Sequence, residues 1–286
     1  MMVCLNRDVL KDVLVGLLPT KKKNRMIFLK SDEEIEFLRI SNQIVAKTLA
    51  ELAKIIAPGV STMHLNNVAD EFIRDNGAVP NFLNYGGFPY SICASVNEQI
   101  VHGFPSEKVF LDDGDIISVD CGALINGFHG DSAYTFCVGD VKPEIKDLLR
   151  TTKESLYKGI EQAEEGRRLG DVGNAIQSYC EERGYSVVRE MIGHGVGRKL
   201  HEAPEVPNYG RKGNGIMLKS GMTIAIEPMI NLGSRHLVFE KDGWTTRTLD
   251  RKPSAHFEHS VAIRRGKADI LSSFEYVEQV LGNKAI

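Results

Sequence analysis

The sequence predicts an α+β fold in which one unit of helices and strands occurs twice. Three separate pairs of glycines recur at one constant spacing in a chain of 286 residues. The pairs, each 107 positions apart, are Gly59 with Gly166, Gly77 with Gly184, and Gly114 with Gly221. An offset kept without a gap predicts two copies of one unit, at about residues 31–150 and 151–275. We expect the copies to pack about a pseudo-twofold axis.

The first copy is predicted to open with two helices. Ser31 followed by Asp32-Glu33-Glu34 supplies a side-chain acceptor at the helix N-terminus and carboxylates in the first turn. Apolar residues then recur at helical spacing until Pro58-Gly59 ends the helix. A second helix with one apolar face begins near Ser61-Thr62, and the second copy repeats this helix after Gly166.

Each copy also contains a short run rich in β-branched residues that predicts a buried strand ending in a carboxylate. Residues 116–119 lead to Asp120, and residues 223–226 lead to Glu227. These two acids are again 107 positions apart, so the pseudo-twofold axis is expected to bring them together at the centre of the fold. A carboxylate buried there is costly unless it is paired or bound to a metal.

Two further acids and one histidine have a similar setting. Asp131 lies in a predicted strand after a glycine-rich turn, and Glu258 lies at the start of another predicted strand. Four converging carboxylates would repel one another and take up protons, whereas two divalent cations would neutralise them. His194, flanked by glycines that allow close backbone approach, completes a ligand set suited to Mn, Fe, Co or Zn. The alternative is that the acids are salt-bridged or at the surface and that His194 is only hydrogen-bonded.

Composition and charge favour a soluble globular protein. Hydrophobic residues make up 42% and charged residues 26%, and the net charge of −3 gives no reason to expect nucleic acid or an acidic membrane as the main partner. No apolar run approaches the roughly 20 residues that span a bilayer. Five scattered cysteines without CxxC spacing indicate reduced thiols, and the N-terminus lacks the pattern of a secretory signal. We therefore expect a cytoplasmic protein.

Residues 1–25 are predicted to be a flexible extension that precedes a single domain of residues 26–286. They end in the basic run Lys21-Lys22-Lys23-Asn24-Arg25, which we interpret as a solvated tail. Binding of this run to ribosomal RNA or another polyanion is the alternative. Translation that begins at Met26 is a further alternative.

The order and spacing of the candidate site residues resemble those of the methionine aminopeptidases. The motifs are Asp120-x10-Asp131, Gly193-His194-Gly195-Val196-Gly197, Glu227-Pro228, Phe257-Glu258-His259, Val96-Asn97-Glu98-x-x-Val101-His102-Gly103 and Leu200-His201-Glu202-x-Pro204. The resemblance covers nearly the whole chain from about Met26 onward. The short spacing between His201 and Glu227 is similar to that of the type I, bacterial form. The resemblance implies the pita-bread fold, in which two pseudo-twofold-related α+β halves surround a central curved, mainly antiparallel sheet.

The resemblance also implies a reaction and a metal site. The reaction is metal-dependent removal of the initiator methionine from nascent proteins and peptides with a small second residue, by attack of a metal-bridging water or hydroxide. Metal ions roughly 3.5–4 Å apart can activate such a water and polarise the carbonyl. Asp131 and Glu258 would bridge two divalent ions (Fe, Mn, Co or Zn). Asp120 would bind one ion, and His194 with Glu227 would bind the other.

Further residues take their roles from the same resemblance. His102 and His201 would contact the substrate and the developing tetrahedral intermediate, and Glu227 would assist proton transfer from the attacking water. The residues expected to line the methionine pocket are Tyr85, Phe88, Cys93 and Trp244. Core packing is the alternative for Cys93 and for Trp244, which we expect on a loop after the turn at Lys241-Asp242-Gly243.

Two departures from the family pattern affect the pocket wall. Leu200 stands where many relatives have an aromatic residue, and Phe88 stands where tyrosine is common. These two departures leave undetermined which substrate side chains the pocket accepts. They do not change the expected reaction. The glycine-rich run around His194 lacks the strand and lysine of a phosphate-binding loop.

Three other functions compete with this interpretation. An X-Pro aminopeptidase or prolidase usually has an additional N-terminal domain, which 25 residues cannot supply. A non-catalytic pita-bread binding module typically lacks metal ligands, whereas all five are present here. A creatinase-like hydrolase of small amidines is the third. For the leading function, the expected partners are nascent polypeptide N-termini and the ribosome, without a membrane or sequence-specific nucleic acid, and the family precedent is a monomer.

Overall fold

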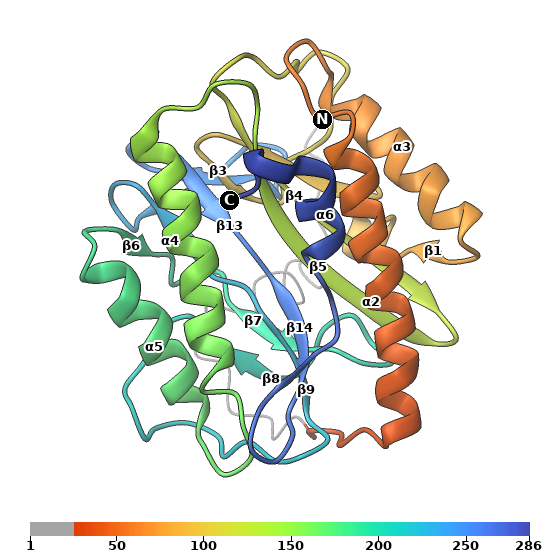
Figure 1. Ribbon diagram of the computed structural model, residues 1–286, viewed down its shortest axis with the longest axis vertical. Coiled ribbons are helices and arrows are strands. Elements are labelled where there is room, and N and C mark those ends of the chain that lie inside the picture. Colours follow the sequence, from red (N-terminus) through yellow and green to blue (C-terminus); the bar gives the residue numbers. More distant parts are fainter. Residues whose placement is uncertain (1–25) are drawn as a thin grey trace, which may run out of the picture.

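The computed structural model describes residues 26–286, so the predicted extension at 1–25 and its basic run lie outside the described residues. Two helices followed by a run of strands occur twice along the chain, and a last short helix follows (Figure 1). The α-helices are α2 (Asp32–Ala53), α3 (Thr62–Asp75), α4 (Pro143–Ile160), α5 (Leu169–Glu181) and α6 (Glu275–Leu281), and the short 3-10 helices are Tyr85–Gly87 and Gly282–Lys284. Helix α2 begins as predicted, because Ser31 and Glu34 form reciprocal capping hydrogen bonds.

Within residues 26–286 the strands form four hydrogen-bonded groups, and every strand pair within a group is antiparallel. One group contains β1 (Val79–Pro80), β2 (Ile92–Val96), β4 (Ile116–Ile125) and β5 (Phe128–Cys137). Another contains β7 (Gly193–Gly195), β8 (Glu202–Val206), β9 (Thr223–Ile226), β14 (His259–Ala262) and β15 (Asp269–Ile270). The smaller groups contain β6 (Ser186–Val187), β10 (Met229–Asn231) and β13 (Ser254–His256), and β3 (Gln99–Val101), β11 (Leu237–Phe239) and β12 (Thr246–Thr248).

The offset of 107 positions recurs in the backbone structure itself. Strands β4 and β9 begin 107 positions apart, as do helices α3 and α5 and strands β1 and β6. The amide of Gly59 donates to the carbonyl of Leu111, and the amide of Gly166 donates to that of Leu218. Both glycines have positive φ, at 86° and 91°, a conformation that suits glycine. The predicted α+β fold with two related halves is therefore confirmed.

Strands β5 and β14 join the two halves at the centre. The hydroxyl of Ser132 donates to the carbonyl of Glu258 at 2.7 Å, and the hydroxyl of Ser260 donates to the carbonyl of Asp131 at 2.9 Å. The amide of Glu258 also donates to the carbonyl of Ala133 at 3.0 Å. In Figure 1 the long helices α2 and α4 lie on either side of β14, and α2 crosses in front of β5. The junction brings two of the predicted acids to adjacent strands.

Helix α2 packs directly against β5. A side chain at Gly130 would lie 2.5 Å from the backbone of Ser41, so only glycine permits this approach. Next to it, the side-chain carbonyl of Asn42 accepts a hydrogen bond from the amide of Asp131 at 3.2 Å. Asn42 is fully buried, and its amide group donates to the carbonyl of Leu38. These contacts fix the segment of β5 that contains Asp131.

A buried ion pair attaches the segment before α2 to the second half of the chain. Lys30 and Glu202 are in hydrogen-bond contact, with side chains only 5% and 7% exposed. We expect Lys30→Met to lower the free energy of unfolding by about 3–5 kcal/mol, because it leaves the charge of Glu202 buried and unpaired. Urea denaturation of the single variant and of Lys30→Met/Glu202→Gln tests this. The double variant should recover most of the loss, and a loss equal to that of the single variant would contradict the explanation.

Candidate metal centre

The first two acids lie on one face of the sheet that contains β4 and β5. Asp120 on β4 is paired with Ala133, and Asp131 on β5 is paired with Gly122. Paired residues of an antiparallel sheet share a face, and so do residues two positions apart along a strand. Asp120 and Asp131 are therefore diagonal neighbours on that face. Asp131 is only 3% exposed, which places its charge in the protein interior.

The other two acids come from the second half of the chain. Glu227 directly follows β9, and Glu258 directly precedes β14. The antiparallel pairing of Ile226 with His259 at the ends of these strands places the two glutamates next to each other. The structure therefore collects one pair of carboxylates from each half.

Burial and mutual repulsion disfavour the ionised form of all four carboxylates. Burial raises the pKa of Asp120 to about 7, with the imidazole of His256 opposing this and Glu227 adding to it. Burial also raises the pKa of Glu227 to about 7. Burial and the neighbouring carboxylates hold the pKa values of Asp131 and Glu258 well above their usual range. Such a cluster is suited to divalent cations, which stabilise the ionised forms.

His194 lies among these acids. Its Nε2 is 3.6 Å from Oδ2 of Asp131 and 3.7 Å from Oε1 of Glu227. Its Nδ1 is 2.9 Å from the carbonyl oxygen of Gly195, which can only accept, so Nδ1 carries the proton. The lone pair on Nε2 is then free to bind a metal, in the arrangement usual for metal-binding histidines.

The donor atoms fit a metal ion. Ligand atoms of Asp131, His194 and Glu258 all lie within 4.8 Å of one another. Within residues 26–286, buried oxygens without a hydrogen-bond partner include Asp120 Oδ1, Asp131 Oδ1 and Glu258 Oε1. Unpartnered buried carboxylate oxygens are costly unless a cation binds them. All five predicted ligands thus lie in one cluster, three of them in the tightest group.

The two further histidines flank this cluster. The ring of His201 lies 4.2 Å from that of His194, and its Nδ1 is 2.8 Å from the hydroxyl of Tyr85. Burial lowers the pKa of His102 to about 4, so its imidazole is neutral at neutral pH. The ring of His102 meets that of Trp244 edge-on at 6.1 Å. The structure therefore places His201 between His194 and the predicted pocket residue Tyr85, and it places His102 against the predicted pocket residue Trp244.

An aromatic cluster lies beside the metal-ligand candidates. Buried Phe88 contacts Trp244 at 5.2 Å between ring centres, and Cys93 is paired with Asp120 in the sheet. Three predicted pocket residues therefore lie together, whereas Tyr85 contacts His201 instead. Trp244 lies outside the strands, as predicted. Leu200, which the sequence analysis placed in the pocket wall, packs in the same cluster. Phe82, Tyr90 and Phe104 also belong to the cluster and were not predicted from the sequence. The aromatic residues between positions 82 and 90 were the sequence feature from which this cluster could have been predicted.

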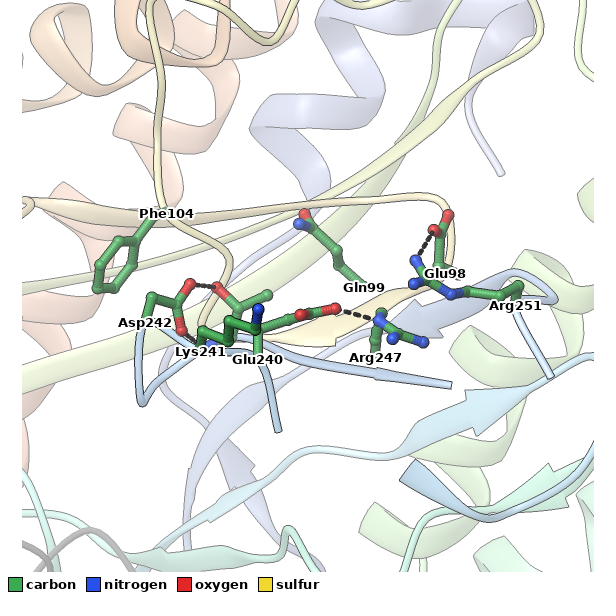
Figure 2. Close-up of a pocket in the computed structure, with 9 residues that line it drawn as sticks. Glu98, Gln99, Phe104, Glu240, Lys241, Asp242, Arg247 and Arg251 are labelled. Atoms are coloured by element: carbon green, nitrogen blue, oxygen red, sulfur yellow. Dashed lines mark hydrogen bonds and ion pairs between the residues drawn. The ribbon is translucent and has the colours of Figure 1, made fainter. Parts of the chain in front are cut away.

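A separate surface pocket of about 360 Å³ shares Phe104 with this aromatic cluster (Figure 2). Four of its charged side chains form two ion pairs: Glu240 with Arg247, and Glu98 with Arg251 at 3.1 Å. None of the predicted site residues lines the pocket. Thr245 in its wall donates to the carbonyl of His102, so this region supports the site from outside.

The comparisons with known proteins agree with the geometry. Residues 36–265 match the model of metallopeptidase family M24. Methionine aminopeptidase 1 of Bacillus subtilis is 51% identical over 247 residues, which cover 86% of this chain and 99% of that protein. Methionine aminopeptidase of Clostridium acetobutylicum is 48% identical, with 87% of this chain and 100% of that protein covered.

Solved structures show the same relationship. A crystal structure of methionine aminopeptidase from Rickettsia prowazekii matches with a TM-score of 0.85 and 40% identity, covering 87% of this chain and all of that chain. An Xaa-Pro dipeptidase from Bacillus anthracis matches with a TM-score of 0.69 but only 23% identity, covering 88% of this chain and 63% of that one. The second match shows a shared fold alone. No helix within residues 26–286 has the length and apolar character needed to cross a membrane.

Proposed function

The chain belongs to metallopeptidase family M24 and, within it, to the methionine aminopeptidases, and from this premise we propose how its site removes an N-terminal methionine. The proposed ligands of two divalent metal ions are Asp120, Asp131, His194, Glu227 and Glu258. The observation that carries the proposal is the convergence of four buried carboxylates and one imidazole, from both halves of the chain, beside an aromatic pocket. Divalent ions bound there supply a Lewis acid for the scissile carbonyl and lower the pKa of water.

The protein's own groups bind the substrate and move its protons. Glu227 accepts a proton from the attacking water, a role suited to a carboxylate that lies beside the proposed metal ligand His194. The imidazole of His201 donates to the oxygen on which negative charge develops. His102, neutral in its buried position, contacts the substrate backbone. Together these groups would stabilise the transition state more than the bound peptide.

The aromatic cluster is proposed to bind the methionine side chain. Phe88 and Trp244 present ring edges and faces, and a thioether makes favourable contacts with both. Burial raises the pKa of the Cys93 thiol well above its usual range, so Cys93 contributes as a small uncharged wall residue. We propose a preference for small second residues, since that residue would lie close to the metal ligands. We further propose that the protein acts as a monomer, in the cytoplasm, on nascent chains.

Peptide hydrolysis by metal-stripped protein reloaded with Mn²⁺ or Fe²⁺ tests the proposal. Met-Ala-Ser should release methionine only after reloading, and a peptide with a bulky second residue should be a poorer substrate. An X-Pro peptide serves as the comparison. Cleavage of the X-Pro peptide alone would move the assignment to the proline-specific branch of the fold. Bound metal without any cleavage would instead favour a binding module.

His201→Ala is expected to lower kcat by roughly 10²–10³-fold, the usual cost of removing one donor to a developing oxyanion. Metal content should stay at the wild-type value, because His201 is not one of the proposed ligands. Steady-state kinetics and metal analysis of the same preparations check both expectations. The exposed His64 gives a matched control, His64→Ala, which should keep full activity. Loss of metal from His201→Ala would show that His201 is a ligand instead.

A further inference from the structure

His256 is a buried histidine of the metal centre to which sequence reasoning gave no role. It is the last residue of β13 and is 1% exposed. Its Nε2 has no hydrogen-bond partner within the described residues, although it lies 3.6 Å from Oε2 of Glu227. An unpaired polar atom in the protein interior is costly and calls for an explanation.

Glu227 lies between two imidazoles. Nε2 of His194 is 3.7 Å from Oε1, and Nε2 of His256 is 3.6 Å from Oε2. His194 is oriented for metal binding because its Nδ1 proton is directed at the Gly195 carbonyl. The two carboxylate oxygens of Glu227 therefore face different partners. Oε1 faces the proposed metal ligand, and Oε2 faces His256.

The backbone of His256 is fixed independently of its ring. Its amide and its carbonyl both bond to the hydroxyl of Thr135, at 3.0 and 2.7 Å, and it is paired with Met229 in the sheet. The ring thus projects from an anchored strand position toward Glu227. A shift of roughly 0.6 Å would shorten the 3.6 Å separation to the usual N–H···O hydrogen-bond distance.

We infer that His256 is a positioning residue whose Nε2–H donates to Oε2 of Glu227 and so directs Oε1 toward the metal. The inference rests on the proposed function, in which Glu227 is a metal ligand. A carboxylate that binds a cation is ionised and can only accept hydrogen bonds. The shared proton must therefore be on the imidazole. Partners that orient a metal ligand in this way typically contribute about 10–100-fold to metal affinity.

Three variants separate the hydrogen bond from the bulk of the side chain. His256→Gln keeps a donor at nearly the position of Nε2, His256→Leu removes it, and His236→Leu makes the same change at an exposed histidine. Calorimetric titration with Co²⁺ measures the affinity of each metal equivalent, and the visible absorption of the Co²⁺ complex reports the ligand geometry. His256→Leu should weaken one equivalent by about 10–100-fold and alter the spectrum. His256→Gln and His236→Leu should match wild type.

Two results would overturn the inference. One is wild-type affinity and spectrum in His256→Leu. The other is a His256→Gln variant as weak as His256→Leu, which would show that the ring itself matters rather than its proton. If His256→Leu does not fold, His256→Asn replaces it, because its shorter amide falls short of Glu227 and should behave like the leucine variant. Failure of wild-type protein to bind Co²⁺ would count against the proposed function instead.

Discussion

Asp131→Ala should abolish metal-dependent hydrolysis and lower kcat/KM by at least about 10³-fold, since the ions stabilise the transition state by several kcal/mol. Asp131 occupies the centre of the cluster. Its Oδ2 is 3.6 Å from Nε2 of His194, its ligand atom groups with that of Glu258, and its carbonyl accepts from Ser260 of the other half. In the proposed site Asp131 would hold metal together with His194 and Glu258, so its loss should impair metal binding.

Metal analysis and peptide hydrolysis of the same preparation test this expectation. Asp131→Ala should retain less than the two equivalents expected of wild type, and added Mn²⁺ should not restore activity. Asp140→Ala is a matched control, because Asp140 is an acid with a 92% exposed side chain. The control should keep both metal and activity. An Asp131→Ala variant with full metal content and activity would place the metal centre elsewhere.

The acids of the site were predictable because the sequence repeats itself. Asp120 and Glu227 end related strands in the two halves, and a common offset of 107 positions indicated that they meet. The runs of β-branched residues before these two acids were enough to predict that each acid ends a buried strand. Asp131 and Glu258 were expected to join them because each also lies in or next to a predicted strand. Their catalytic roles remain predictions.

His256 was not predictable as a neighbour of Glu227. A histidine two positions before Glu258 is indistinguishable in the sequence from a structural histidine in a strand. Its place in the site depends on the pairing of β13 with β10 and on the hydroxyl of Thr135, about 120 positions earlier in the chain. The packing of the aromatic cluster was not predictable for the same reason, because it depends on contacts between distant parts of the chain. Phe104 contacts Phe88 at 5.4 Å only because separate loops fold together.

Stabilisation by divalent metal is expected to grow as pH rises from about 4 to above 7. Burial raises the pKa of Asp120 from 3.8 to about 7 and that of Glu227 from 4.5 to about 7. In this window the folded metal-free protein keeps protons that the unfolded chain has released. The stability of the metal-free protein therefore falls as pH rises. The loss is complete once the pH exceeds the raised pKa values of the two carboxyl groups. Each unit of pKa shift corresponds to about 1.4 kcal/mol, so the total amounts to several kcal/mol.

Bound cations reverse this penalty, because they bind the ionised carboxylates and displace the protons. The difference in Tm between Mn²⁺-loaded and EDTA-treated protein should therefore be small near pH 5 and several degrees larger near pH 8. Glu227→Gln removes one titrating group and should flatten the pH dependence of the EDTA-treated protein. A Tm difference that stays constant between these pH values would contradict the argument, because it would mean that the four carboxylates are already ionised without metal and that their repulsion is balanced by other groups.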